Sequence, residues 1–255
     1  MWWTNRVKYV ILYGDILCDG IFSVFLQEGR LKMGKLIVIE GTDGSGKSTQ
    51  FRLLSQHLSD DQVEFKHIVF PRYSEESSAL IRMYLGGQFG DKPSDVNAYA
   101  ASSFYAVDRF ASYKMDWGKY YEDGGVVLSD RYTTSNAVHQ TSKEKEEDRE
   151  AFLQWLYDFE YGKLGLPKPD LIIYLDVPTD FTEKLLRHRE QDTNTSADIH
   201  EKDMAYLATC RQVGRQAANF YNWSIINCVK DGAMRSMEDI HNEIYGLVRR
   251  CLEEK

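Results

Sequence analysis

Residues 41–49 carry the pattern whose chemistry is easiest to state. They fit G-x-x-x-x-G-K-[ST] and are Gly41, Thr42, Asp43, Gly44, Ser45, Gly46, Lys47, Ser48 and Thr49. Glycines let a backbone wrap a phosphate closely, while the loop amides and the start of a following helix supply positive potential. We expect this segment to bind ATP, with Lys47 bridging the β- and γ-phosphates and Ser48 binding Mg²⁺.

Three arginines indicate a second anion site. Arg72 and Arg131 each follow a predicted strand, and Arg109 lies in a predicted helix. Because the carboxyl ends of strands form the ligand crevice of open α/β sheets, we expect Arg72 and Arg131 to point into it. Tyr105 precedes Arg109 by one helical turn, so its ring could stack on a base while the arginine holds the phosphate. Transfer between two phosphates requires such clamps on donor and acceptor.

The elements that must position these residues alternate along the chain. Short apolar runs predict strands at 35–40, 63–70, 126–129, 171–175 and 224–228. Helical patterns lie at 47–59, 77–85, 94–117, 147–161, 180–189, 198–221 and 236–252. This alternation predicts an α/β fold with a five-stranded parallel sheet covered by helices on both faces. Polar residues 191–197 lie between two helices, where a lid could hinge.

Composition and charge exclude several classes of protein. The 255 residues are 43% hydrophobic, and 31 basic against 39 acidic residues give a net charge of −8. A nucleic-acid partner is disfavoured, because it would require a net basic face. The apolar run at 10–26 is interrupted by Asp15 and Asp19, so it is a poor signal peptide and a poor membrane span. Four cysteines without paired spacing indicate thiols in a reducing, cytoplasmic compartment.

The pattern changes at Met33, where a strongly patterned domain begins. We expect 1–32 to be an N-terminal extension, either a mis-assigned start or a loosely attached arm, and 33–255 to be the domain that carries the phosphate loop.

Five motifs in this domain carry a family resemblance. They are Glu40 to Thr49, Phe70-Pro-Arg-Tyr73, Asp108-Arg109, Ser129 to Ala137, and Leu164 to Asp170. In their order and spacing the sequence resembles thymidylate kinase, specifically the bacterial type with the Phe-Pro-Arg-Tyr motif. The resemblance implies a P-loop NTPase fold, a three-layer sandwich with a mobile lid at about 187–203. It also implies transfer of the γ-phosphoryl group of ATP to dTMP, giving dTDP and ADP for dTTP biosynthesis, with Mg²⁺ and as a homodimer.

The resemblance also implies roles for residues around the reacting phosphates. Asp130 and Arg131 resemble the pair at the reaction centre, with the carboxylate near the Mg²⁺ that Ser48 binds. The phosphate loop carries no arginine between Asp43 and Lys47. Catalytic arginines are therefore expected from the lid, where Arg187 and Arg189 are the candidates.

The dTMP site follows from the same resemblance. Arg72 and Arg109 resemble the residues that hold the thymidylate phosphate, and Tyr105 matches the ring that stacks on thymine. Asp43 matches the aspartate that approaches the 3′-hydroxyl and the metal. The resemblance also implies that Ser135 and Asn136 lie beside the base. His139 stands where the family often has an aromatic residue against a 2′-hydroxyl, and Glu201 belongs to the acidic end of the lid.

Two other functions remain open. One is a kinase for another nucleotide or a deoxynucleoside. The other is a non-catalytic nucleotide-binding switch, although the N-K-x-D pattern of GTPases is absent. Arg72, Tyr105 and Arg109 argue against a switch, because a switch has no use for a second nucleotide pocket.

Overall fold

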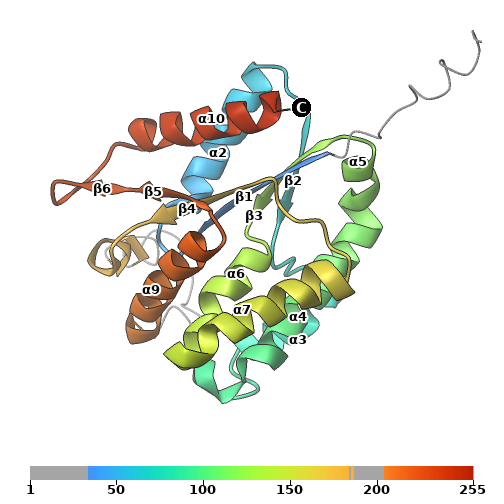
Figure 1. The fold of residues 1–255 in the computed structure, drawn as a ribbon, viewed down its shortest axis with the longest axis vertical. Helices are drawn as coiled ribbons and strands as arrows, with labels where there is room; N and C mark the ends of the chain where they lie inside the picture. Colours follow the sequence, from blue (N-terminus) through green and yellow to red (C-terminus); the bar gives the residue numbers. More distant parts are fainter. Residues whose placement is uncertain (1–33, 184, 187–203, 255) are drawn as a thin grey trace, which may run out of the picture. The chain divides into compact units, whose positions relative to one another are not determined.

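The computed structural model describes residues 34–183, 185–186 and 204–254. The predictions for the N-terminal extension at 1–32 and for the lid at 187–203 lie outside these residues. Within them the predicted fold class is confirmed, because five parallel strands form one sheet with helices on both sides (Figure 1).

The sheet has the order β2-β3-β1-β4-β5, so β1 lies at its centre. Its strands are β1 (Lys35–Gly41), β2 (Phe65–Val69), β3 (Val126–Asp130), β4 (Leu171–Asp176) and β5 (Ser224–Asn227). All neighbouring pairs are parallel. In a parallel sheet buried on both faces, side chains alternate between two apolar layers. Accordingly Ile37 and Ile39 belong to one core cluster, while Leu36 and Val38 belong to another.

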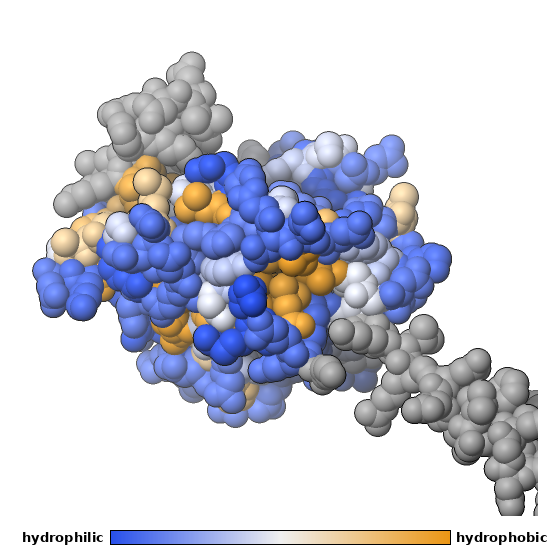
Figure 2. Space-filling view, turned by 90° about the horizontal axis from the view of Figure 1, so that it is seen from above, coloured by the Kyte–Doolittle hydropathy of each residue, from blue (hydrophilic) through white to orange (hydrophobic). Residues whose placement is uncertain are grey.

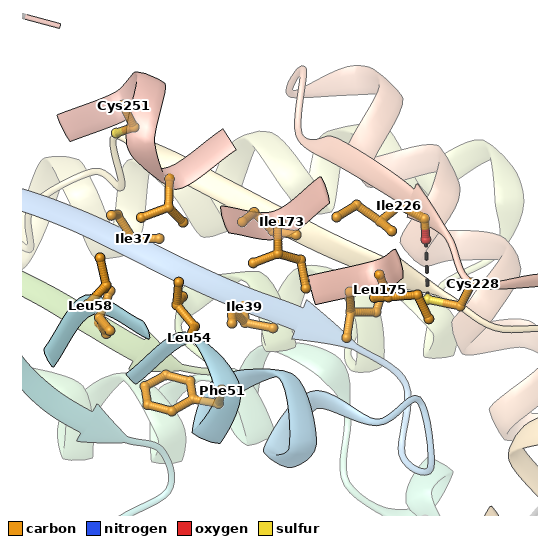
Figure 3. Packing of buried hydrophobic residues seen from close by; sticks show 14 of the residues in the cluster. Ile37, Ile39, Phe51, Leu54, Leu58, Ile173, Leu175, Ile226, Cys228 and Cys251 are labelled. Carbon is orange, nitrogen blue, oxygen red and sulfur yellow. Dashed lines mark hydrogen bonds between the residues drawn. The ribbon is translucent and has the colours of Figure 1, made fainter. Parts of the chain in front are cut away.

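The first cluster lies beneath α2 (Lys47–Asp60) and α10 (Met237–Glu253). Figure 3 shows Phe51 and Leu54 of α2 close to the β1 side chains. Most of the other described helices lie on the other side of the sheet in Figure 1. These are α3 (Ala79–Leu85), α4 (Ala98–Ser112), α5 (Gly118–Glu122), α6 (Thr133–His139), α7 (Arg149–Tyr157) and α9 (Met204–Phe220). The layers place the ends of β1 and β3, together with α2, α4 and α6, around one region.

Several boundaries differ from the predictions. The helix predicted at 94–117 begins at Ala98, where the Asn97 side chain accepts a hydrogen bond from the Ala100 amide at 2.8 Å. Beyond Ser112 it continues through a π-helical turn, Tyr113–Trp117, into α5. The short helix α6 was not predicted, because threonine, serine and asparagine have low helix propensity. The small antiparallel pair β6 (Val229–Lys230) and β7 (Ala233–Met234) was also not predicted.

The described surface shows mixed polarity. On the face in Figure 2 hydrophilic residues predominate, and hydrophobic ones form smaller groups. Among the described residues, no helix has the length and apolar character that crossing a membrane requires.

Candidate active site

The phosphate loop connects the end of β1 to the start of α2, as the motif predicts. Gly44 and Gly46 have φ values of 76° and 84°, a conformation that favours glycine. A Cβ on Gly44 would lie 2.8 Å from the carbonyl oxygen of Thr182. Only glycine therefore fits at position 44, where a neighbouring segment covers the loop.

Lys47 lies inside this loop and is buried. Its Nζ donates to the carbonyl oxygens of Gly41 at 2.8 Å and Thr42 at 2.9 Å. Burial, and next the charge of Arg131, lower the pKa of the Lys47 ammonium. Two of its three N–H groups hold the loop in shape, and the third can meet a phosphate oxygen.

Arg131 follows β3 with a φ of 67°, and it reaches the phosphate loop. Its guanidinium donates to Asp43, to Ser135 Oγ at 3.1 Å and to Glu40 Oε1 at 3.5 Å. Burial alone would lower the pKa of Arg131, but the carboxylates of Asp43 and Glu40 outweigh it and raise that pKa. A fully charged guanidinium is therefore held beside the loop that would carry the donor phosphates.

Glu40 is a buried carboxylate that contacts both the phosphate loop and Arg131. It accepts hydrogen bonds from the Gly41 amide at 2.9 Å and from the hydroxyls of Thr134 and Ser135, each at 2.7 Å. It thereby ties the phosphate loop to the start of α6, in addition to holding Arg131.

Asp130 carries a carboxylate oxygen that could bind a metal ion. Among the described residues its buried Oδ1 has no hydrogen-bond partner, and Asp130 lines the same cavity as the exposed Ser48. Within these residues no group of three or more His, Cys, Asp or Glu could hold a metal. One carboxylate and one hydroxyl nevertheless fit Mg²⁺, which usually takes its other ligands from water and substrate phosphates.

A cavity of about 520 Å³ extends from the phosphate loop to α4 and α6. The predicted residues that line it away from the loop are Tyr105, Arg109, Ser135, Asn136 and His139. They come from two helices, so the fold brings together a ring, a guanidinium and an amide that lie up to 31 residues apart in the sequence.

The polar groups of this region have defined hydrogen-bond directions. Arg109, 1% exposed, donates through Nε and Nη2 to Glu160 at 2.6 and 2.5 Å, and through Nη1 to the Tyr132 carbonyl oxygen at 3.4 Å. Asn136 Nδ2 donates to the Ser102 carbonyl oxygen at 3.2 Å and to Glu160 Oε1 at 3.1 Å. Both N–H groups of the Asn136 amide are thus engaged, which leaves its oxygen as an acceptor.

The family model described as thymidylate kinase matches residues 39–244. A thymidylate kinase of Mycobacterium tuberculosis (strain ATCC 25618 / H37Rv) is 34% identical over 172 residues, covering 66% of this chain and 78% of that protein. This chain belongs to the thymidylate kinase family.

Other members of the family are similar over more of the chain. A probable thymidylate kinase of Pyrococcus horikoshii is 31% identical over 220 residues, covering 86% of this chain and 98% of that protein. A solved thymidylate kinase structure from Candida albicans has a TM-score of 0.63 at 22% identity, covers 86% of this chain and 92% of its own, and shares the fold. Because the relatives include archaeal and eukaryotic proteins, they do not single out the bacterial type.

Arg72 pairs with residues beside the main cavity. Its Nε donates to Asp108 Oδ1 at 3.3 Å and its Nη2 to Ser77 Oγ at 3.0 Å. It lines a separate depression beside β2, while the neighbouring Tyr73 lines the main cavity. A buried carboxylate on α4 thus holds the Arg72 guanidinium beside the main cavity, and its contact with the thymidylate phosphate stays a prediction.

His139 lies against Arg131 and Cys210. Its Nε2 is 3.5 Å from Arg131 Nη1, and its Nδ1 is 3.6 Å from Cys210 Sγ. Three other predicted site residues, Arg187, Arg189 and Glu201, lie outside the described part of the chain.

Sequence reasoning missed three residues of the site. Glu40 and Glu160 are buried carboxylates, and nothing in their local pattern shows which distant side chains they meet. Gln140 is 1% exposed and lines the cavity, yet among the described residues neither polar atom of its side chain has a hydrogen-bond partner. A buried amide without partners beside a cavity is available to a ligand.

Proposed function

We propose that this chain transfers the γ-phosphoryl group of ATP to dTMP, producing dTDP and ADP. The observation that carries the proposal is the continuity of one cavity from Lys47 and Ser48 in the phosphate loop to Tyr105, Arg109 and Asn136. A cavity with both a phosphate loop and a base-sized polar pocket suits a kinase for nucleoside monophosphates better than a switch.

The transfer needs alignment and neutralisation of charge. A phosphate monoester has a second pKa near 6, so the acceptor oxygen is already largely ionised at neutral pH and needs no general base. Lys47 and Arg131 would face the charge that spreads over the transferring group. Arg187 and Arg189 are proposed to add cationic groups from the lid, and Glu201 to complete its acidic end.

Ser48 and Asp130 are the residues we assign to Mg²⁺. Bound there with ATP, the ion would neutralise charge on the β- and γ-phosphates. Asp43, which holds Arg131 in the structure, would approach the 3′-hydroxyl of the acceptor.

Recognition of thymine follows from the hydrogen-bond directions. Tyr105 would stack on the base. The imide edge of thymine has an N–H donor between two carbonyl acceptors, which matches the Asn136 oxygen beside the N–H groups left over on Arg109. Because Glu160 already compensates the charge of Arg109, we assign this arginine to a base carbonyl rather than to the phosphate. Gln140 adds a donor and an acceptor in the same wall, with Ser135 and His139 nearby.

Three finer assignments complete the proposal. Residues 70–73 read Phe-Pro-Arg-Tyr, and on this motif we place the chain with the bacterial type. We propose a homodimer formed through the long helices, since α4 exposes Tyr99, Val107 and Phe110. The free, buried thiols of Cys210, Cys228 and Cys251 suit the cytoplasm. Light scattering after gel filtration would measure the oligomeric state.

The function is tested by ADP release from the purified full chain, measured in a coupled assay with ATP, Mg²⁺ and each monophosphate in turn. We expect dTMP to give the highest kcat/KM. Equal rates with all monophosphates would refute the specificity, and ATP binding without acceptor-dependent turnover would favour a switch.

A further inference from the structure

Glu160 lies outside the cavity but contacts two residues that line it. It is fully buried in the π-helical turn Asp158–Lys163 that follows α7. Such turns are frequent at functional sites, where they redirect a side chain. Here the turn places a carboxylate against α4 and α6.

Every hydrogen-bonding position of this carboxylate is occupied. Oε1 accepts from Arg109 Nη2 at 2.5 Å and from Asn136 Nδ2 at 3.1 Å. Oε2 accepts from Arg109 Nε at 2.6 Å and from Thr133 Oγ1 at 2.8 Å. Two oxygens with about four lone-pair sites thus receive four donors. Since an ionised carboxylate only accepts, both cavity residues must turn N–H groups toward it.

We propose that Glu160 is a positioning residue that sets the hydrogen-bond polarity of the base site. By taking an N–H of the Asn136 amide, it keeps that amide's oxygen available as an acceptor. By taking one N–H group at Nε and one at Nη2 of Arg109, it fixes the plane of the guanidinium. The Tyr132 carbonyl oxygen takes a third, so two of the five N–H groups are left for a ligand.

This polarity favours thymine over cytosine, and the inference therefore rests on the proposed function. Thymine offers a donor at N3 and an acceptor at position 4, whereas cytosine offers an acceptor at N3 and a donor at position 4. The Asn136 oxygen and the Arg109 N–H groups can pair with the N3 donor and the position-4 acceptor of thymine. Against cytosine, acceptor would face acceptor and donor would face donor, and a buried site strongly disfavours such unpaired groups.

Glu160→Gln tests the proposal, because the amide keeps the shape but introduces N–H donors. The measured quantity is the ratio of kcat/KM for dTMP to that for dCMP, which does not depend on the fraction of folded enzyme. We expect the ratio to fall about tenfold or more, with KM for dTMP rising and KM for ATP unchanged, since one charge-assisted bond contributes about 1.5–3 kcal/mol.

Asp158→Asn is the matched control. Asp158 lies on the same π-helical turn, but its side chain is 61% exposed and pairs with Lys163. The substitution Asp158→Asn removes the same charge as Glu160→Gln. The ratio of kcat/KM for dTMP to that for dCMP should nevertheless stay at the wild-type value. A ratio within twofold of wild type in Glu160→Gln would overturn the proposal, even if the variant were less stable.

Thr133→Val covers the case in which Glu160→Gln does not fold. It deletes one of the four hydrogen bonds on Glu160 and does not line the cavity. We expect the ratio to fall two- to fivefold, and an unchanged ratio would again contradict the proposal. Failure of the proposed function looks different: the wild-type chain would then prefer another monophosphate over dTMP.

Discussion

Replacing Glu40 by glutamine would isolate what its charge does at the phosphate site. The carboxylate is fully buried and accepts from the Gly41 amide and from the hydroxyls of Thr134 and Ser135. A glutamine of the same shape can still accept from Gly41 through its oxygen. Its NH₂ group must then face the hydroxyls of Thr134 and Ser135. Arg131, which donates to the same oxygen as Gly41, is left with a neutral amide oxygen in place of a carboxylate.

The magnitude follows from the two hydroxyl contacts at 2.7 Å. A hydrogen bond to a charged group contributes about 1.5–3 kcal/mol, against about 0.5–1.5 kcal/mol between neutral groups. If both hydroxyls rotate to accept from the new amide, each contact weakens by about 1 kcal/mol. We therefore expect Glu40→Gln to lower the free energy of unfolding by about 2 kcal/mol. Because a neutral amide holds Arg131 less firmly than a carboxylate does, kcat should fall by about 10- to 100-fold.

Urea unfolding followed by circular dichroism gives the stability, and the coupled ADP assay gives kcat. Glu64→Gln is the control, because Glu64 is exposed and the same charge change there should leave both quantities at the wild-type values. Wild-type stability and turnover in Glu40→Gln would refute the reasoning, since it would show that the buried charge neither holds the loop nor positions Arg131.

Three further changes test other parts of the structure. Asp130→Asn should raise the Mg²⁺ concentration for half-maximal turnover at least tenfold, and an unchanged titration would remove Asp130 from the metal site. Gly214→Ala places a Cβ 2.3 Å from Tyr174 Oη and should lower the free energy of unfolding by about 1–3 kcal/mol in urea. The open Gly246→Ala serves as its control and should not destabilise. Burial lowers the pKa of His241, so the free energy of unfolding should fall as pH drops below 6.5. Between pH 7.5 and 5.5 the urea midpoint of His241→Gln should therefore change less than that of the wild type.

The strands and the phosphate loop could be predicted because their signals are local. A β-branched run such as 35–40 can be satisfied only in a buried sheet, and the glycine spacing of 41–46 determines the loop that follows. The short helix α6 could not be predicted from propensity. It is stable because its residues pack between other elements, where Thr133 and Thr134 donate to buried carboxylates.

The direction of the Arg72 side chain could not be predicted for the same reason. The position of an arginine after a strand indicates where its backbone lies, and on that ground Arg72 and Arg131 looked equivalent. Their side chains differ because Asp108 lies within reach of Arg72, while Asp43 and Glu40 lie within reach of Arg131. These partners are 36, 88 and 91 residues away in the sequence. No local pattern reports a contact over that distance.

The distant partners also explain how an acidic protein builds a site for two anions. A buried guanidinium is costly unless a carboxylate compensates it, and each of the three predicted arginines within the described residues has one. A cavity lined with uncompensated cations would bind any polyanion. Guanidinium groups that are paired with carboxylates carry little excess charge, and their remaining N–H groups point in fixed directions. They therefore favour a ligand whose oxygens and N–H groups match those directions. In this arrangement the carboxylates determine selectivity, even where, like Glu160, they do not line the cavity.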